Sequence, residues 1–376
     1  MNIKSLLIGS AAALVAVSGA RAADAVMAPE PEPVEYVRVC DAYGAGFFYI
    51  PGTETCLKIS GYVWYQIATG SYEAGDTPTY HLGALPNQDG WAKSIRARVN
   101  FDARSETEWG TLRSYIRLQS TWNGVGDGGA TVDQAYIELG GFKMGYSESF
   151  WVDSGNGGPS NYGSHSWTGM YYGYQQRALI GYRFDSNGFF GALSLEDDNY
   201  TGTGVGGGYT PDVVAKLGYA GGWGAVWAKV GYDESYGAGG ALDGFGAQLG
   251  AQFNMPNMPG SSLRVIAYYA DGDHSYATGG SPGSGIGGGS AEWSVLASYN
   301  QQFSETLGVS VAGQYFSDIY AAGTNNNGGG VDGWAAELSV VWFPVKDFEV
   351  RSEIGYTDTD ITSGSVSGFL RFTRYF

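Results

Sequence analysis

The sequence predicts an all-β fold, a roughly 16-stranded antiparallel transmembrane β-barrel. Segments of roughly 9–11 residues alternate between apolar and polar positions, the pattern and length of tilted membrane strands. Short turns alternate with long Gly- and Asn-rich loops, as on the two rims of a single-chain barrel. The last segment, Ser367–Phe376, alternates up to a terminal aromatic. Because a strand in lipid must pair on both edges, we expect it to close the barrel onto the first strand.

The N-terminus, residues 1–22, has the features of a secretory signal peptide. Lys4 precedes a short apolar stretch, Leu6–Val17, and Ala20-Arg21-Ala22 has the small-residue pattern of a cleavage site. The apolar stretch is too short to span a bilayer. We therefore expect a cleaved signal, export through the periplasm and a mature chain that begins at Ala23.

The composition favours strands and excludes nucleic-acid binding. The chain has 62 Gly, 28 Tyr, 17 Phe and 11 Trp, which suits tightly turned strands with aromatic girdles. Its formal charge is -17, and a nucleic-acid binder needs a basic surface. The acidic loops are suited to divalent cations and anionic lipopolysaccharide at an outer surface, although solubility is a simpler explanation.

Residues 23–56 are expected to form a periplasmic N-terminal segment ahead of the barrel at 57–376. The segment starts with an acidic, proline-spaced tether, residues 23–35. Cys40 and Cys56 are the two cysteines, and such a pair in an exported protein indicates a disulfide. Closing so short a loop stabilises the chain by roughly 3 kcal/mol. We expect a structural role, because neither cysteine has a CxxC partner or a nearby histidine.

The strands are expected to begin near residues 57, 92, 111, 131, 142, 177, 188, 212, 223, 243, 262, 291, 306, 332, 347 and 366. In the second strand, odd positions such as Ile95 and Val99 are apolar, and even positions carry polar or charged residues. Long loops are expected near 67–91, 148–176, 197–211, 271–290, 317–331 and 357–365.

A ladder of arginines follows one face of the second and third expected strands, and it consists of Arg96, Arg98, Arg113 and Arg117. A charge on the lipid face costs roughly 2–4 kcal/mol at mid-membrane, so we expect these side chains to face the lumen as a basic wall. The alternative is that they pair with Asp102, Glu138 or other acids to stabilise the barrel. Both interpretations are compatible.

The loop from Ser147 to Gln176 contains seven aromatic residues, which does not suit a solvated loop. We expect it to fold into the barrel and bury them on the inner wall. Glu148 and Asp153 would then face the arginines across a narrowed channel and orient polar solutes. The alternative is a surface loop that uses its aromatic residues for subunit contacts.

No motif indicates catalysis, a cofactor or a metal site. The sequence lacks HExxH and zinc-ligand spacing. His81, His165 and His274 all fall in expected loops. Asp271-Gly-Asp273-His274 has the residue types of a divalent-ion site, but a solvated acidic turn is the preferred interpretation.

The block from Val39 to Tyr62, with C-D-A-Y-G-A-G-F-F-Y-I-P-G-T-E-T-C-L, resembles the porins of Rhizobiales, of the Brucella and Rhizobium type. The signal peptide, the Pro/Glu tether and the terminal Arg-Tyr-Phe are also similar. The resemblance implies a homotrimer of sixteen-stranded barrels, with the third external loop folded inward as a constriction. It also implies passive channels for small hydrophilic solutes and ions.

These features together lead us to expect a general porin of the bacterial outer membrane, without catalysis or cofactor. Aromatic girdle residues should face outward toward lipid, among them Trp293, Tyr299, Trp334, Trp342 and Tyr356. The alternatives are a channel selective for oligosaccharides or other nutrients, an outer-membrane hydrolase, and an adhesin or phage receptor. A hydrolase would need a Ser/His pair on the wall, and the loop positions of the histidines weigh against one. The acidic loops favour cations and the arginines favour anions, with cations weakly preferred.

Overall fold

The computed structural model describes residues 38–70, 91–123, 128–153, 163–197, 209–238, 240–282, 288–327 and 329–376. Residues Val39–Phe376 form one compact unit. The expected signal peptide and proline-spaced tether lie outside the described residues, as does His81.

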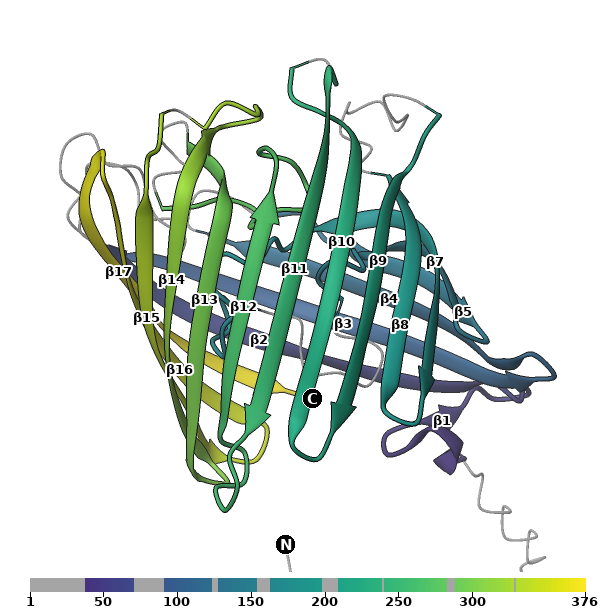
Figure 1. Ribbon diagram of the computed structural model, residues 1–376. Helices are drawn as coiled ribbons and strands as arrows, with labels where there is room; N and C mark the ends of the chain where they lie inside the picture. The colour runs from purple at the N-terminus through teal and green to yellow at the C-terminus, as the bar shows by residue number, and fades with distance from the viewer. Residues whose placement is uncertain are drawn as a thin grey trace, which may run out of the picture. The chain divides into compact units, whose positions relative to one another are not determined.

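Sixteen long strands, β2 to β17, form the wall (Figure 1). Their bounds are β2 Cys56–Gly70, β3 Ala92–Thr107, β4 Gly110–Trp122, β5 Thr131–Leu139, β6 Phe142–Glu148, β7 Gln176–Ser186, β8 Phe189–Asp197, β9 Asp212–Gly221, β10 Gly224–Tyr236, β11 Leu242–Asn254, β12 Ser262–Ala270, β13 Gly288–Ser304, β14 Leu307–Ala321, β15 Gly333–Val345, β16 Phe348–Thr359 and β17 Thr362–Tyr375. Each begins within a few residues of its expected position.

The sheet closes on itself. Every strand from β2 to β17 pairs antiparallel with its neighbour in sequence, as β2 does with β3 and β16 with β17. The terminal strand β17 then pairs with β2, from Ser367↔Gly70 to Tyr375↔Tyr62. The expected closure by the C-terminal strand is confirmed, because this arrangement leaves neither of the two strands with an open edge.

The strands alternate as a membrane barrel requires, with one residue facing out and the next facing in. On β10, Val226, Val230 and Tyr232 are exposed, whereas Trp227 and Lys229 between them are buried. The expected girdle residues lie at outward positions of their strands, and Trp293 is 54% exposed. Within the described ranges, the chain contains no helix whose length and hydropathy suit a membrane span.

One expected loop is wrong. Strands β16 and β17 continue through most of residues 357–365, with Thr357 paired to Ser365 and Thr359 to Thr362. Only Asp360 and Ile361 lie between these two strands. The Thr-, Ser- and Gly-rich composition of this hairpin hides its strands, because polar side chains occupy both of its faces.

The N-terminal part of the unit packs against the first residues of β2. A short 3-10 helix, Asp41–Tyr43, precedes β1, Phe48–Tyr49, which pairs with the first residues of β2. The expected disulfide between Cys40 and Cys56 is present, and both cysteines are buried against Phe47.

Candidate functional site

The expected arginine ladder lies on one face of β3 and β4, within a network of hydrogen bonds. Arg96 Nε donates to Thr121 Oγ1 at 2.8 Å. Arg98 donates to Gln119 Oε1 at 2.6 Å and lies 3.5 Å from a carboxylate oxygen of Asp133. These partners come from β4 and β5, so the ladder joins neighbouring strands.

The other two arginines of the ladder contact acids of the same wall. Arg113 contacts Asp102 at 2.9 Å and Glu138 at 2.7 Å. Arg117 forms an ion pair with Asp133. The expected pairing of arginines with wall acids, including Asp102 and Glu138, is therefore present.

The two expected loop acids lie in different places. Glu148 ends β6 and joins the ladder directly, with one oxygen 3.6 Å from Arg117 Nη1. Asp153 instead contacts Lys143 on β6 at 3.4 Å and Arg183 on β7 at 2.9 Å. Asp153 thus has basic partners that the sequence analysis did not single out.

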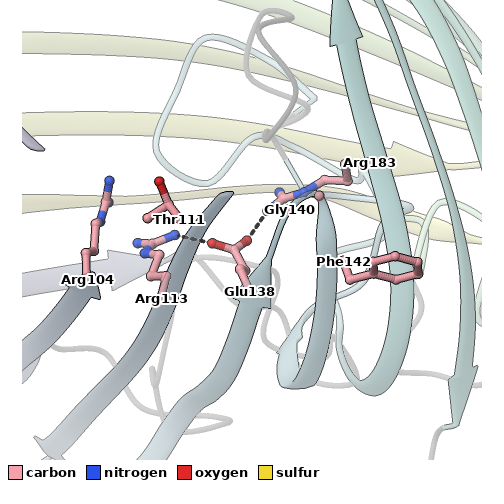
Figure 2. A pocket seen from close by; sticks show the side chains of 8 residues that line it. Arg104, Thr111, Arg113, Glu138, Gly140, Phe142 and Arg183 are labelled. Carbon is pink, nitrogen blue, oxygen red and sulfur yellow. Dashed lines mark hydrogen bonds and ion pairs between the residues drawn. The ribbon is translucent and has the colours of Figure 1, made fainter. Parts of the chain in front are cut away.

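Near the turn between β3 and β4, the wall has a charged cavity of about 350 Å³, which Arg113 of the ladder helps to line. Figure 2 shows Arg104, Arg113 and Arg183 pointing toward one region, with Glu138 between the last two. Arg104 also forms an ion pair with Asp102 at 2.7 Å. Positive and negative groups alternate here, so the surface suits water and small polar solutes.

The loop between β6 and β7 lies inside the barrel, because its backbone contacts the wall of distant strands. Lys216 Nζ on β9 donates to the carbonyl of Asp153 at 2.9 Å, and Lys229 Nζ on β10 donates to that of Trp151 at 2.6 Å. Arg264 on β12 donates to the carbonyl of Gly163 at 3.2 Å. These three cations are buried, and they orient the loop by satisfying its carbonyl groups.

The far end of the same loop rests on two buried glutamates. Glu353 on β16 accepts from the backbone N–H of Trp167 at 2.7 Å, and Glu337 on β15 accepts from Thr168 Oγ1 at 2.7 Å. The Trp167 ring stacks on the guanidinium of Arg371 at 3.6 Å. The described parts of the loop therefore follow the inner wall from β7 to β17.

His165 contradicts the expectation about a Ser/His pair. Its Nδ1 lies 2.7 Å from Ser298 Oγ and its Nε2 2.8 Å from Ser262 Oγ, both on the wall. The sequence did not indicate this, because the three residues are far apart along the chain. Burial and the nearby Arg264 guanidinium lower the pKa of His165 to about 3. A general base works best with a pKa near the operating pH, so this histidine is suited to anchoring the loop.

The acidic turn after β12 is solvated at Asp271, whose side chain is 45% exposed, and its two aspartates also accept hydrogen bonds from backbone N–H groups. Asp273 accepts the backbone N–H of Ser290 at 2.6 Å and that of Gly323 at 2.7 Å, and Asp271 accepts that of Phe245 at 2.8 Å. Across the described ranges, no group of three or more His, Cys, Asp or Glu side chains is placed to hold a metal ion.

The loop divides the inner wall into a covered and an uncovered side. Inward residues of β10 such as Lys229 are only 2% exposed. On β3 and β4, by contrast, the side chains of Arg104 and Arg113 are 28% and 21% exposed. The accessible part of the interior thus lies against β3 and β4.

Several wall cations were missed by the sequence analysis, namely Arg104, Lys143, Arg183, Lys216, Lys229, Arg264 and Arg371. A usable signal existed for Lys216, Lys229 and Arg264, because each is a lone cation with apolar neighbours at an inward position, as in Val214-Ala-Lys-Leu-Gly218. A lone charge of this kind indicates a lumen-facing residue as clearly as the ladder does.

Known proteins with similar sequences or structures point in one direction. A family model described as "Porin subfamily" matches residues 24–369. Porin Omp2b of Brucella suis biovar 1 is 35% identical over 406 residues, and the alignment covers 100% of each chain. Porin Omp2a of Brucella ovis is 45% identical over 257 residues, which cover 60% of this chain and 69% of that one.

A solved structure has a similar fold at low identity. The outer membrane channel DcaP of Acinetobacter baumannii matches with a TM-score of 0.66 and 15% identity, over 87% of this chain and 99% of that one. Another match is OmpT of Vibrio cholerae in its trimer form, with a TM-score of 0.54 and 11% identity, over 86% of this chain and 100% of that one. These matches show a shared barrel fold.

Proposed function

This chain belongs to the porin subfamily, and we propose that it acts in the bacterial outer membrane as a passive, water-filled diffusion channel for small hydrophilic solutes and ions. Its resemblance to the Brucella and Rhizobium type porins is confirmed by the family match. The coarse function, an outer-membrane porin channel, follows from that membership.

One observation supports the passive channel most directly. The inner face of β3 and β4 is charged and partly exposed, although it lies inside a closed sheet. Partly exposed guanidinium and carboxylate groups in a barrel interior need water, because a dry buried charge costs several kcal/mol. The arrangement is therefore that of a hydrated passage.

The passage should select weakly by charge. We assign the basic wall to Arg96, Arg98, Arg113 and Arg117, with the acid Glu148 beside Arg117 and the acid Asp153 beside Lys143 and Arg183. Three of these arginines lie within 4 Å of a carboxylate. Opposite charges at such distances largely cancel beyond a Debye length, which is about 8 Å at physiological ionic strength. Solutes then sense closely spaced charges of both signs more than a net charge.

A solute-selective channel of the same fold is less favoured. Such a channel would need a row of aromatic side chains along the passage. In the described part of the loop, Phe150, Trp151 and Tyr172 are instead buried in a hydrophobic cluster with Leu179 and Val214. Their surface serves packing and is not offered to sugars.

The assembly and location follow from the same proposal. We expect a homotrimer, a state that the similar OmpT structure adopts in its trimer form. The exposed apolar outer face would contact membrane lipid and lipopolysaccharide. We also propose removal of residues 1–22 as a signal peptide, which mass spectrometry of the mature protein would test. We propose no enzymatic role.

Reversal potential in a planar bilayer under a salt gradient tests the channel. Purified, folded protein should give steady conductance steps and a small displacement of the reversal potential from zero. Absence of conductance from folded protein would reject the proposed function. A conductance that saturates with one sugar, and is blocked by it, would favour the solute-selective alternative.

A further inference from the structure

The segment between β12 and β13 is a second loop that packs inside the barrel. Of its described residues, Tyr276, Ala277, Thr278 and Ser281 are each at most 1% exposed. A loop that simply projected from the rim into water would not bury four consecutive or near-consecutive residues so completely. This loop, residues 271–282, is called the second loop below.

Tyr276 fills a socket that glycines leave open in the wall. Gly231 on β10 and Gly246 on β11 are directly paired across the sheet. A Cβ atom on Gly231 would collide with the Tyr276 ring, and one on Gly246 would collide with the Tyr276 carbonyl. Any larger residue at either position would therefore displace the second loop.

The polar end of Tyr276 has matching partners beyond the socket. Its hydroxyl donates to Asp212 at 2.9 Å and lies 3.4 Å from a carboxylate oxygen of Glu196. Asp233 on β10 accepts the backbone N–H of Ser275 at 2.9 Å. The second loop is thus held by specific hydrogen bonds as well as by packing.

The second loop also contacts the inward loop between β6 and β7. Trp151 Nε1 donates to the carbonyl of Ala277 at 3.3 Å, and Gln175 Nε2 donates to that of Ser275 at 2.8 Å. The Trp151 and Tyr276 rings meet edge to face, with centroids 6.0 Å apart. The two loops therefore share one hydrophobic cluster.

From these contacts we propose that the second loop is a further size-determining element of the channel, with Tyr276 as its anchor. It fills the interior over β8 to β11 together with the first inward loop. Solutes are thereby confined to the arginine-lined side at β3 and β4. This inference rests on the proposed channel function.

The test compares single-channel conductance of Tyr276→Ala and Gly246→Ala with the unaltered protein. The first substitution removes the anchor and the second obstructs its seat. Both should increase conductance by about twofold and admit larger sugars in liposome swelling, since pore diameter sets what passes. Tyr232→Ala is the matched control, because Tyr232 adjoins Gly231 on β10 and faces outward. It should conduct like the unaltered protein.

Thiol labelling gives a second readout that does not depend on conductance. Ala277→Cys should resist a membrane-impermeant maleimide, because Ala277 is 1% exposed. Asn325→Cys, on the exposed loop after β14, should react rapidly. Adding Gly246→Ala to Ala277→Cys should make its thiol reactive.

The outcomes separate the two proposals. If the unaltered protein does not conduct, the channel function fails, and labelling still decides whether the second loop is docked. A second outcome is that the unaltered protein conducts, and that Gly246→Ala makes the Ala277→Cys thiol reactive without raising the conductance. In that case the second loop does not set the pore size. Rapid labelling of Ala277→Cys alone would show that the loop is not held inside.

Discussion

Arg96 differs from the other three arginines of the ladder in the partner of its guanidinium. Among the described residues it donates to the hydroxyl of Thr121, whereas Arg98, Arg113 and Arg117 contact carboxylates. Its charge is therefore the least compensated of the four. A permeating ion that passes this wall should sense Arg96 more strongly than its neighbours.

Arg96→Gln should accordingly shift the reversal potential toward cation preference. Two unit charges 4 Å apart in bulk water interact by about 1 kcal/mol, so the ratio of cation to anion permeability should rise by about twofold to fivefold. The measurement is reversal potential in a salt gradient. Arg374→Gln is the control, because that side chain is 59% exposed at the end of β17 and should leave the ratio unchanged. Equal shifts from both variants would contradict the assignment.

The docking of the inward loop between β6 and β7 should depend on pH through His165. Its folded pKa is lowered from 6.5 to about 3, so the undocked loop binds more protons below pH 6.5. The contribution of the neutral imidazole to docking is thus fully present above pH 6.5. It is lost progressively as the pH falls from 6.5 toward 3, by at most about 1.4 kcal/mol per pH unit.

Current noise from loop motion should therefore increase between pH 7.5 and pH 5. His165→Asn keeps a donor and an acceptor but does not titrate in this range. The acid-induced increase should be smaller in this variant than in the unaltered protein. If both show the same increase, groups other than His165 govern the acid response of the loop.

At the scale of elements, the disulfide joins the N-terminal segment to the first residue of β2, and the barrel strands also have ladders of their own. The disulfide fixes residues 40–56, whereas β2 is held by its ladders to β3 and β17. Closing a loop of this size contributes roughly 3 kcal/mol, and that contribution should fall on the segment alone.

The double variant Cys40→Ser, Cys56→Ser should therefore keep the melting temperature of the barrel. It should also become sensitive to protease between residues 41 and 55. Heat-dependent gel mobility reports the barrel, and mass spectrometry of the digest reports the segment. A lower barrel melting temperature in the double variant would show that the two parts unfold together.

The strands and the inward fold of the loop between β6 and β7 could be predicted from the sequence, but the contacts that hold the loops could not. Alternation such as Ile95-Arg96-Ala97-Arg98-Val99 is local, and lipid outside with water inside enforces it. The prediction of a loop at 357–365 was wrong because the polar residues of this hairpin show no such alternation. The seat of Tyr276 on Gly231 and Gly246 depends on contacts between distant segments, which no local pattern contains.

The contacts of the interior charges were also only partly predictable from local sequence patterns. The ladder was found because Arg96 and Arg98 are adjacent inward positions of one strand. Lys229 and Arg264 are isolated, and their partners are loop carbonyls that only the folded chain brings near. A buried carbonyl without a donor costs about 1–3 kcal/mol, so Lys229 and Arg264 stabilise the loop by donating to its carbonyl groups. The alternation within one strand does not show which loop carbonyl lies nearby.

At the scale of the whole molecule, barrel closure depends on one seam. Gly61 on β2 exchanges two backbone hydrogen bonds with Phe376, at 3.0 and 3.1 Å. A Cβ atom at Gly61 would collide with the carbonyl oxygen of Arg98 on β3 and lie 2.8 Å from the Phe376 ring. The terminal aromatic and the first strand thus meet where no side chain fits.

Gly61→Ala should consequently weaken closure, because the added methyl must displace backbone rather than a flexible side chain. Overpacking of this kind costs about 1–3 kcal/mol. Gly313→Ala on β14 is the matched control, since its Cβ would have only the carbonyl oxygen of Ala335 within 4 Å, at 3.8 Å. Heat-dependent gel mobility should show a lower melting temperature for Gly61→Ala than for Gly313→Ala. The control should itself be close to the unaltered protein, because alanine suits a strand better than glycine. Equal melting temperatures would mean that the seam tolerates a side chain, and closure would then depend on the β17 to β2 ladder as a whole rather than on the contact of Gly61 with Phe376.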